Sequence, residues 1–306
     1  MNNLNHNPGS DMQSAAVVLV NFNSAEYLTM AVGSLLNDES VREIVVVDNG
    51  SQDASLDILR QKVSDNRIRI IETRENLGFA RAVNIGANNL ASSYLVLVNP
   101  DCLLDPGAVS ELIRRANDLP EAGVVGALVV NPDGTEQRGC RRRLPTPVSG
   151  LGESVLFRWL LTGFNQTGEP LPDRPVRVEA VSGAFMAIKA DVFRRLRGMD
   201  EGYFLHFEDI DICARAAAAG YGVWFVPQAR AVHEKGVSSR SRPLFVEWHK
   251  HRGMWRFFRQ HYPPCRHAWV RWLVWCGVSS RFAGIALMAS PRIFSMWLRR
   301  VAGTAT

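Results

Sequence analysis

The chain has 306 residues, a net charge of +5, 46% hydrophobic residues and 21% charged residues. This composition is ordinary for a globular chain that buries a core, and the length allows one large domain with an appendage or two small domains. Five scattered cysteines with no CxxC spacing exclude a cysteine-rich metal site and fit reduced thiols in the cytoplasm.

The N-terminal stretch 1–14 is polar and rich in asparagine, and it lacks the apolar segment of a signal peptide. We expect it to be a disordered leader. The body of the protein is therefore expected to stay in the cytoplasm.

Residues 15–98 alternate between apolar, β-branched runs and stretches with helical spacing. Strands are predicted at 15–20, 43–47, 68–72 and 94–98, and helices at 26–36, about 54–63 and about 80–89. Ser24 is the expected N-cap of the first helix. This alternation predicts right-handed βαβ units and an α/β fold with a mainly parallel, Rossmann-like sheet flanked by helices. Ligands bind at the carboxyl ends of such strands, where Asn23, Asp48, Asn76 and Asp101 fall.

Beyond Asp101 the pattern changes. Helices are predicted at 107–119, 191–196 and 207–219, the last closed by Gly220, and strands at 124–130 and 221–226. A turn at 131–134 is expected between two strands, and 176–188 resembles a strand pair interrupted at Ser182-Gly183. The stretch 139–175 is rich in loops, with a short apolar helix near 153–161. Two helical segments, 243–261 and 268–297, follow.

Two aspartates end buried strands and are candidates for ligand binding. Asp48 suits the ribose or base of a nucleotide, although a turn residue that caps the next helix would look the same. Asp101 follows Asn99-Pro100 and could hold Mg²⁺ if a diphosphate supplied further oxygens. A plain NPD turn is the alternative for that segment.

A third set of acids lies at 208–211, in the first turn of a predicted helix. Acids at this position favour the helix dipole. Because the preceding residues 203–207 are apolar and aromatic, we also expect raised pKa values, as a general base requires. His233 follows the last predicted strand, ahead of a glycine- and serine-rich stretch at 236–239. A lone histidine is more often structural, but a metal or phosphate role is considered for it.

Together these motifs, in this order, resemble family 2 glycosyltransferases of the GT-A fold. The motifs are DNGS (48–51), NLGFARAVNIG (76–86), NPD (99–101), SGAFMAIKADVF (182–193), FEDIDICARAAAAGY (207–221) and VHEKG (232–236). The likeness covers about 17–239 and is strongest with bacterial dTDP-rhamnosyltransferases of surface polysaccharide assembly. It implies one GT-A domain, with a nucleotide-sugar-binding half at 15–130 and an acceptor-binding, catalytic half at 131–240.

The resemblance also implies roles for residues at matching positions. The nucleotide would contact Asn21, Asn23, Asp48, Asn76, Gly78, Arg81 and Asn84. Mg²⁺ or Mn²⁺ would be held by Asp101 and His233, although Asn99 stands where the family's DXD motif has its first aspartate. Asp209 would be the catalytic base, with Glu208 beside it. The donor and acceptor pocket would include Gly183, Ala184, Phe185, Arg141 and Arg142.

The reaction that the resemblance implies is an inverting transfer of L-rhamnose from dTDP-rhamnose to a glycan acceptor, which we expect to be lipid-linked. The basic loop at 138–143 would then contact an anionic acceptor such as a lipid pyrophosphate, or it is a solvated charge run. UDP-galactose, UDP-glucose or another sugar nucleotide stays open as donor. A nucleotidyltransferase is disfavoured because no Gly-rich basic loop follows the first strand. A catalytically inactive glycan-binding or scaffold protein is the other alternative, and a homodimer is also considered.

The C-terminal segment 241–306 is expected to be a basic, aromatic, helical tail. From Lys235 onward there are thirteen Lys and Arg and one acid, a net +12 that leaves −7 for the rest, and six of the eight tryptophans lie in the tail. Arginines interrupt the apolar stretch 268–289, which favours a helix in the membrane interface over a span or simple packing. We therefore expect peripheral association with an anionic membrane, the inner face of a bacterial plasma membrane, and no nucleic-acid partner.

Overall fold

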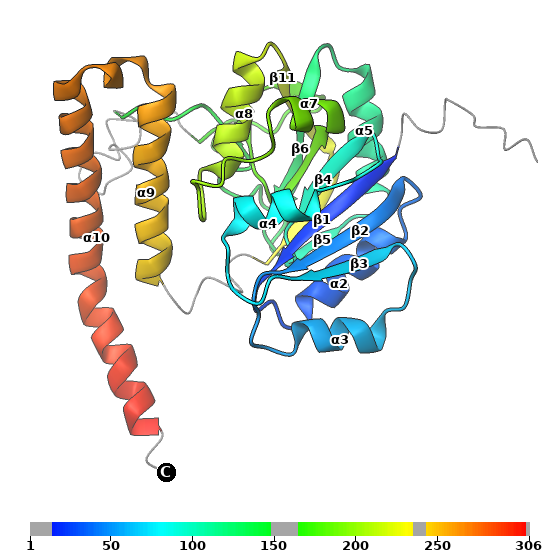
Figure 1. Cartoon of the computed structure of the whole chain (residues 1–306), viewed down its shortest axis with the longest axis horizontal. Helices are drawn as coiled ribbons and strands as arrows, with labels where there is room; N and C mark the ends of the chain where they lie inside the picture. The colour runs from blue at the N-terminus through cyan, green and yellow to red at the C-terminus, as the bar shows by residue number, and fades with distance from the viewer. Residues whose placement is uncertain (1–13, 148–164, 235–242, 304–306) are drawn as a thin grey trace, which may run out of the picture.

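A computed structural model of the chain describes residues 14–147, 165–234 and 243–303. The leader expected at 1–14 falls almost wholly outside these residues, as do the apolar helix expected at 153–161 and the stretch 236–239 behind His233. The described residues form a sheet domain with two long helices beside it (Figure 1).

The first half of the central sheet is parallel, as predicted. Its strands, in the order β3-β2-β1-β4, are β3 (Ile68–Glu72), β2 (Val41–Asp48), β1 (Ala15–Asn21) and β4 (Tyr94–Val98). The connections carry α2 (Tyr27–Leu36), α3 (Ser55–Lys62) and α4 (Phe79–Gly86). The strands β1 and β4 are buried along their whole length and almost entirely apolar, as strands covered on both faces are, and Asn21 is the polar residue that ends β1.

The second half of the sheet is mixed. The strand β10 (Phe185–Lys189) runs antiparallel between β4 and β6 (Ala122–Val130), and β6 pairs in parallel with β11 (Gly222–His233). A short strand that the sequence did not predict, β5 (Cys102–Leu104), pairs antiparallel with the end of β11. Within the described residues this makes a nine-stranded α/β sheet, so the expected fold class is confirmed, with its parallel character concentrated in the first four strands.

The prediction that residues 176–188 form two strands paired with each other is wrong, because the strands found there pair with strands elsewhere in the chain. The stretch contains three strands, of which β8 (Val176–Arg177) pairs with β11 and β9 (Ala180–Val181) pairs with β7 (Arg141–Arg142). Gly126 of β6 explains the second pairing, because a Cβ there would lie 2.4 Å from the side chain of Val181. The missing side chain leaves room for β9 to cross over the sheet.

Three smaller expectations are also corrected. Ser24 does not cap α2: its hydroxyl donates to the side chain of Asn21, and Glu26 occupies the N-cap position. After the turn at 131–134 the expected second strand is reduced to one bridge, between Val130 and Glu136. The last strand is longer than predicted, since β11 continues to His233 after an irregularity between Val226 and Arg230.

The remaining helices fall close to their predicted ranges. They are α5 (Ala108–Asp118), α7 (Ala190–Arg195), α8 (Glu208–Ala218), α9 (Pro243–His261) and α10 (Ala268–Gly303). The last two form a hairpin through a short 3-10 turn, with α9 toward the sheet domain and α10 outside it (Figure 1). In the part of the chain that the structure describes, no helix has the length and apolar character needed to cross a membrane.

Candidate functional site

A buried amide and a carboxylate meet at the carboxyl ends of β1 and β2. Asn21 and Asp48 are register partners, and Asn21 Nδ2 lies 2.7 Å from Asp48 Oδ1. The same nitrogen lies 3.1 Å from Ser51 Oγ and 2.9 Å from Ser55 Oγ, while Asp48 Oδ2 accepts from the backbone N–H of Ser51. We call Asn21, Asp48, Ser51 and Ser55 the donor-side cluster. It fixes Asp48 through neutral donors. Ser51 belongs to the DNGS motif, whereas Ser55 lies outside the motifs of the sequence analysis.

Asn23 borders this cluster in a left-handed backbone conformation, with φ of 52°. Its N–H donates to Ser51 Oγ and its side-chain oxygen accepts from the N–H of Gln52. Asparagine tolerates this conformation better than most residues. The structure therefore gives Asn23 a role in shaping the loop beside Asp48.

Asn49 joins the donor-side loop to the segment that carries Asn76 and Gly78. Its Nδ2 donates to Asn76 Oδ1 at 3.1 Å and to the carbonyl of Gly78 at 3.3 Å, and its Oδ1 accepts from the N–H of Leu77. Gly78 has φ of +85°, and a Cβ on it would lie 2.7 Å from the carbonyl oxygen of Phe204. Only glycine fits here, so this motif packs directly against the segment that leads to Glu208.

Arg81 and Asn84 of the same motif face elsewhere. The exposed Arg81 is 3.9 Å from Glu201, and Asn84 accepts from the N–H of Met199 and donates to its carbonyl. The amide of Asn84 thereby ties α4 to the chain ahead of α8. The structure does not bring these two side chains to the donor-side cluster.

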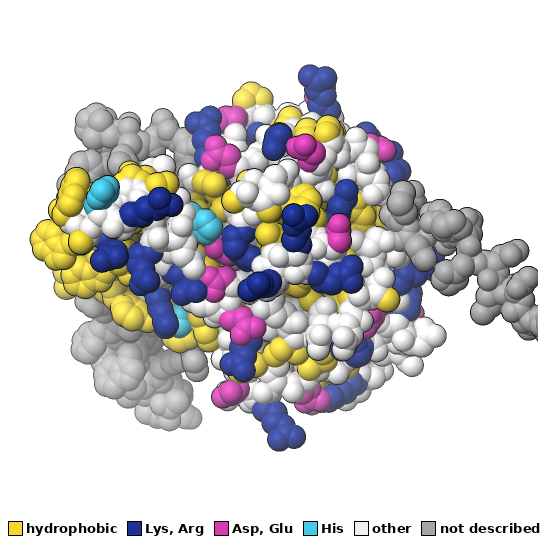
Figure 2. Space-filling view, turned by 45° about the horizontal axis from the view of Figure 1, so that its top comes forward, with side chains coloured by type: hydrophobic (Ala, Val, Ile, Leu, Met, Phe, Trp, Pro, Cys, Tyr) yellow, Lys and Arg dark blue, Asp and Glu magenta, His cyan; other side chains and the backbone are white. Residues whose placement is uncertain are grey.

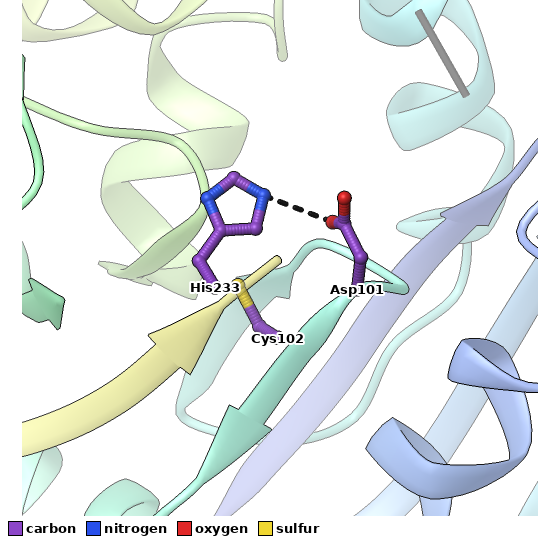
Figure 3. Close-up of side chains that lie close together, drawn as sticks. All are labelled: Asp101, Cys102 and His233. Carbon is purple, nitrogen blue, oxygen red and sulfur yellow. Dashed lines mark hydrogen bonds and ion pairs between the residues drawn. The ribbon is translucent and has the colours of Figure 1, made fainter. Parts of the chain in front are cut away.

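Asp101 and His233 meet at the end of β11 (Figure 3). The antiparallel pairing of β5 and β11 sets His233 opposite Cys102, so that His233 Nε2 lies 2.9 Å from Asp101 Oδ1. Both residues are buried. We call Asp101 and His233 the metal pair, since it unites the two candidate metal ligands, which are 132 residues apart in the sequence.

Gln137 orients the imidazole of the metal pair. Its amide nitrogen donates to Asn131 Oδ1 and to the carbonyl of His233, which leaves its Oε1 facing His233 Nδ1 at 2.6 Å. Nδ1 then donates its hydrogen to Gln137, and Nε2 is the ring nitrogen directed at Asp101. A histidine that ligates a metal is usually held in this way, by a hydrogen bond from its other ring nitrogen.

The ligand atoms that Asp101 and His233 offer fit a divalent cation of the Mg²⁺ or Mn²⁺ type. A carboxylate and an imidazole are available, and phosphate oxygens of a bound diphosphate would complete the coordination. Cys102 lies within reach of both residues but is a poor ligand. Burial, with the nearby Asp101 adding to it, raises the pKa of its thiol well above the usual range, and Sγ donates to the carbonyl of Ala184 at 3.4 Å.

A second group of charged side chains lies where α8 begins. Arg142 forms an ion pair with Asp209 through Nη2 and Oδ2, and the N–H of Gly183 donates to the same Oδ2 at 3.2 Å. Asp209 Oδ1 accepts from the N–H of Ile210. We call Arg142, Gly183, Glu208 and Asp209 the transfer-side cluster. In it the candidate base is neutralised by an arginine that the sequence placed in the acceptor pocket.

Glu208 is the unsatisfied member of the transfer-side cluster. It is 7% exposed, and its Oε2 has no hydrogen-bond partner among the described residues. Burial, followed by the charge of Asp209, raises the pKa of Glu208 to about 8. The pKa of Glu208 is therefore raised, as expected for an acid in these apolar and aromatic surroundings.

The backbone ahead of Glu208 is strained. His206 and Phe207 have φ of 66° and 74°, a left-handed conformation that bulky residues rarely adopt. Such strain costs about 1–3 kcal/mol per residue and persists only where the surroundings hold the chain. The two residues turn the chain sharply into α8, in whose first turn Asp209 accepts from the N–H of Gly183.

The turn Gly183-Ala184 connects the metal pair with the transfer-side cluster. Gly183 contacts Asp209, and the carbonyl of Ala184 accepts from the N–H of Asn99, two residues ahead of Asp101. A Cβ on Gly183 would lie 3.3 Å from Cβ of Asp209, so a side chain there would crowd the carboxylate. The segment that carries Asp101 and the segment that carries Asp209 therefore both contact the turn Gly183-Ala184.

Two residues predicted for the pocket belong to the interior of the fold. Phe185 is fully buried in β10, in register with Val98. Arg141 donates to both carboxylate oxygens of Glu136 and to the carbonyls of Glu169 and Pro170. Its guanidinium is occupied by these contacts, so the basic loop offers Arg142 to the site but keeps Arg141 within the fold.

Comparisons with known proteins indicate the family to which the chain belongs. Residues 16–196 match the profile of Glycosyl transferase family 2. The chain is 27% identical, over 84% of its length and 87% of the relative's, to N-acetylglucosaminyl-diphospho-decaprenol L-rhamnosyltransferase of Mycobacterium tuberculosis. It is 34% identical to rhamnosyltransferase WbbL of Escherichia coli, over 74% of this chain and 85% of that protein.

Two solved structures share the fold. One is GalNAc-T7 with UDP, GalNAc and Mn²⁺, with a TM-score of 0.56, 18% identity, and coverage of 72% of this chain and 44% of that one. The other is the mannosyltransferase PcManGT of Pyrobaculum calidifontis with GDP-Man and Mn²⁺, with a TM-score of 0.55, 16% identity, and coverage of 92% and 80%. At these identities the likeness is one of fold.

Proposed function

Because this chain belongs to glycosyl transferase family 2, we propose that it transfers L-rhamnose from dTDP-rhamnose to a glycan acceptor carried on a lipid, with inversion. One observation carries the proposal: the metal pair and Asp209 are tied to the same turn, Gly183-Ala184. A single displacement needs a place for the leaving diphosphate and a base for the incoming hydroxyl close together. The names of the two bacterial relatives support rhamnose as the sugar.

The donor-side cluster would hold the nucleoside. Asp48 is fixed by Asn21 and by the N–H of Ser51 before any ligand arrives. A carboxylate accepts hydrogen bonds from ribose hydroxyls or from the N–H of a base, and bonds to a charged group contribute about 1.5–3 kcal/mol. Asn76, Gly78 and Asn23 shape the loops around it, while Arg81 and Asn84 would need to move to reach the nucleotide.

The metal pair would hold the diphosphate. A divalent cation bound there would neutralise the negative charge that grows on the diphosphate as the glycosidic bond breaks. Gln137 keeps His233 Nε2 pointed at this place, and Asp101 supplies a charged oxygen. Asn99 lies 3.4 Å from His233 Nε2 through its amide nitrogen, so it contributes a donor where the family's DXD motif has a carboxylate.

Asp209 would act as the general base. It takes the proton of the acceptor hydroxyl as that oxygen bonds to the anomeric carbon, and the bond to the diphosphate oxygen breaks with its electron pair staying on the diphosphate. Attack from the face opposite the leaving group inverts the configuration. Since Arg142 neutralises Asp209 in this structure, the arginine must leave the carboxylate, and an anionic acceptor phosphate would attract it.

A screen of sugar nucleotides tests the proposal. Thermal unfolding with Mn²⁺ and dTDP-rhamnose, UDP-galactose, UDP-glucose or a GDP-sugar should show the largest rise in Tm for the true donor, because binding to the native state stabilises it. Donor turnover with a polyprenyl-diphosphate-linked acceptor then separates an enzyme from an inactive glycan-binding protein. Stabilisation by a UDP-sugar alone would overturn the rhamnose assignment, and binding without turnover would overturn the transfer.

The α9–α10 hairpin would bring the enzyme to its lipid-linked acceptor at the inner face of the bacterial plasma membrane. Among the residues whose burial the structure describes, most of the strongly exposed large hydrophobic side chains lie on it: Phe245, Trp248, Trp269, Trp272, Leu273, Trp275 and Leu287. Figure 2 shows hydrophobic and basic side chains gathered together over this end of the molecule. Tryptophan and arginine at such density suit the headgroup region of an anionic bilayer.

Flotation with anionic vesicles tests the membrane contact. Replacing Trp269, Trp272 and Trp275 by alanine should lower vesicle binding at least about tenfold, because burying one aromatic side chain contributes ~1.5–3 kcal/mol. Leu171→Ala, at an exposed hydrophobic residue of the sheet domain, is the matched control and should bind as the wild type does. Equal flotation of the triple variant and the control would contradict a membrane role for this face.

A further inference from the structure

We infer that α9 is a positioning helix of the active site, in which Arg256, Gln260 and His261 hold the segment 200–211 that carries Glu208 and Asp209. This inference rests on the proposed function in one respect, the use of Asp209 as base. The face of α9 that packs on the sheet domain would then position catalytic residues, although α9 is the first helix of the C-terminal hairpin.

The first contact is a two-point ion pair at the start of the segment. Arg256 donates to Asp200 through Nε at 2.9 Å and through Nη2 at 2.8 Å. Gln260 donates to the same carboxylate at 3.0 Å. The guanidinium of Arg256 also lies 5.5 Å from the ring centroid of Tyr203. A planar guanidinium on a carboxylate and a ring fixes orientation as well as distance, which a lysine would not do.

The second contact lies on the far side of the two acids. Asp211 is 1% exposed, and its two oxygens accept from His261 Nε2 at 2.8 Å and from Arg215 Nε at 2.7 Å. The buried Tyr203 donates its hydroxyl to Gln260 Oε1 at 2.7 Å. The helix α9 therefore grips the segment both before and after Glu208 and Asp209.

The helix α4 also holds this segment. The N–H of Phe79 donates to the carbonyl of Phe204 at 2.7 Å, and Asn84 binds the backbone of Met199. Gly253 lets α9 approach closely, since a Cβ there would lie 3.0 Å from the carbonyl oxygen of His206. Contacts from α4 and α9 thus hold the chain around the strained residues His206 and Phe207, which explains why the strain persists.

Loss of this grip should misplace Asp209 without disturbing the nucleotide. Within the described residues, the side-chain hydrogen bonds that fix Asp48 and join Asp101 to His233 involve no residue of α9. A displacement of about 1 Å at a reacting group can cost on the order of 10²-fold in rate. We therefore expect a selective loss of kcat, with the KM for the donor and the affinity for the nucleotide retained.

The experiment compares Arg256→Ala and Arg256→Lys with Arg259→Ala in the full-length protein. Arg259 is an exposed arginine about one turn further along α9. Its guanidinium lies over Trp255 and is not one of the contacts described above between α9 and the segment 200–211. Arg256→Ala should lower kcat about 10- to 100-fold with an unchanged donor KM, Arg256→Lys should restore part of it, and Arg259→Ala should match the wild type. Equal kcat for all of them, or a parallel loss of nucleotide affinity, would overturn the inference.

Hydrogen exchange gives a readout that does not depend on turnover. Backbone amides of 203–211 should exchange faster in Arg256→Ala, and in the milder His261→Gln, than in Arg259→Ala, while amides of β1 and β2 stay protected. Unchanged protection of 203–211 would refute positioning by α9 even if the wild type transferred no sugar. Lack of transfer by the wild type with every donor, together with the expected exchange, would refute the proposed function alone.

Discussion

The donor-side and transfer-side clusters hold their carboxylates in opposite ways. Asp48 is fixed by two neutral donors, the side-chain amide of Asn21 at the end of β1 and the backbone N–H of Ser51 in the turn after β2. Asp209 is fixed by a cation 67 residues away, beside a buried glutamate whose Oε2 has no partner among the described residues. The first arrangement is complete before a ligand binds. The second has to change for the reaction to proceed, and this difference separates binding from chemistry.

The largest expected effect comes from Asp209→Asn. It removes the proton acceptor but keeps the shape, so turnover should fall about 10²- to 10⁴-fold, the usual contribution of a general base. Nucleotide affinity, measured by the shift in Tm, should stay within about twofold. Asp57→Asn, at an exposed aspartate of α3, serves as control. Wild-type turnover in Asp209→Asn would contradict the assignment of the chemical step to the transfer-side cluster, because Asp209 would then not be the base.

Gln137→Leu tests whether the metal pair, like the donor-side cluster, is held in position before a ligand binds. Without the partner of Nδ1 the imidazole of His233 loses its fixed orientation. Removal of such a supporting group typically weakens metal affinity about 10- to 100-fold. The Mn²⁺ concentration that gives half-maximal turnover should rise accordingly, with turnover largely recovered at saturating metal. No change in the metal requirement would show that Gln137 does not orient a ligand.

Asp48→Asn should raise the donor KM about tenfold with little change in kcat. The exchange of a charged acceptor for a neutral one costs roughly 1–1.5 kcal/mol per hydrogen bond, and the loss is felt equally in the ground state and the transition state. Asp209→Asn should lower turnover and keep nucleotide affinity, whereas Asp48→Asn should raise the donor KM and keep kcat. The two variants together would separate the binding role of one cluster from the chemical role of the other. A fall in kcat with an unchanged KM would instead give Asp48 a part in the chemical step.

Glu208→Gln should show the smallest effect, on stability and its pH dependence. Because the pKa of Glu208 rises from 4.5 to about 8 on folding, the native state binds one more proton between these values. Wild-type stability should therefore fall as pH rises from about 4.5 to 8. The variant lacks this dependence and should be more stable by about 1–3 kcal/mol at pH 8.5, near the cost of a buried unsatisfied group.

Urea unfolding at pH 5, 7 and 8.5 measures this difference. Glu39→Gln, at an exposed glutamate, is the control and should follow the wild type at every pH. If Glu208→Gln lost stability at pH 8.5, the glutamate would be satisfied as an anion. The transfer-side cluster would then resemble the donor-side cluster more closely than the structure indicates.

The sequence predicted the positions of Asp48 and Asp101 at the strand ends because local pattern determines them. Apolar runs mark β1, β2 and β4, and the polar residues that follow them, Asp48 and Asp101, must lie at one edge of a parallel sheet. The approach of His233 to Asp101 was predicted only through the family likeness. Its physical cause is the pairing of β5 with β11, and a three-residue strand leaves too weak a periodic signal to detect.

The transfer side was harder to predict because its contacts join distant residues with no shared pattern. Nothing local distinguishes Arg142, which pairs with Asp209, from Arg141, which pairs with Glu136 inside the fold. The alternation of side chains along β7 decides between them, and a two-residue strand cannot be recognised in a loop-rich stretch. The grip of α9 on Asp200 and Asp211 likewise depends on how the tail folds back.

The most direct test is the anomeric configuration of the product. Wild-type enzyme, Mn²⁺, dTDP-rhamnose and a polyprenyl-diphosphate-linked acceptor would be incubated together, and the new glycosidic linkage analysed by NMR. A single displacement with Asp209 as base predicts the configuration opposite to that of the donor, and no product from Asp209→Asn above a background about 10²-fold lower. A linkage with the donor's own configuration would contradict the account.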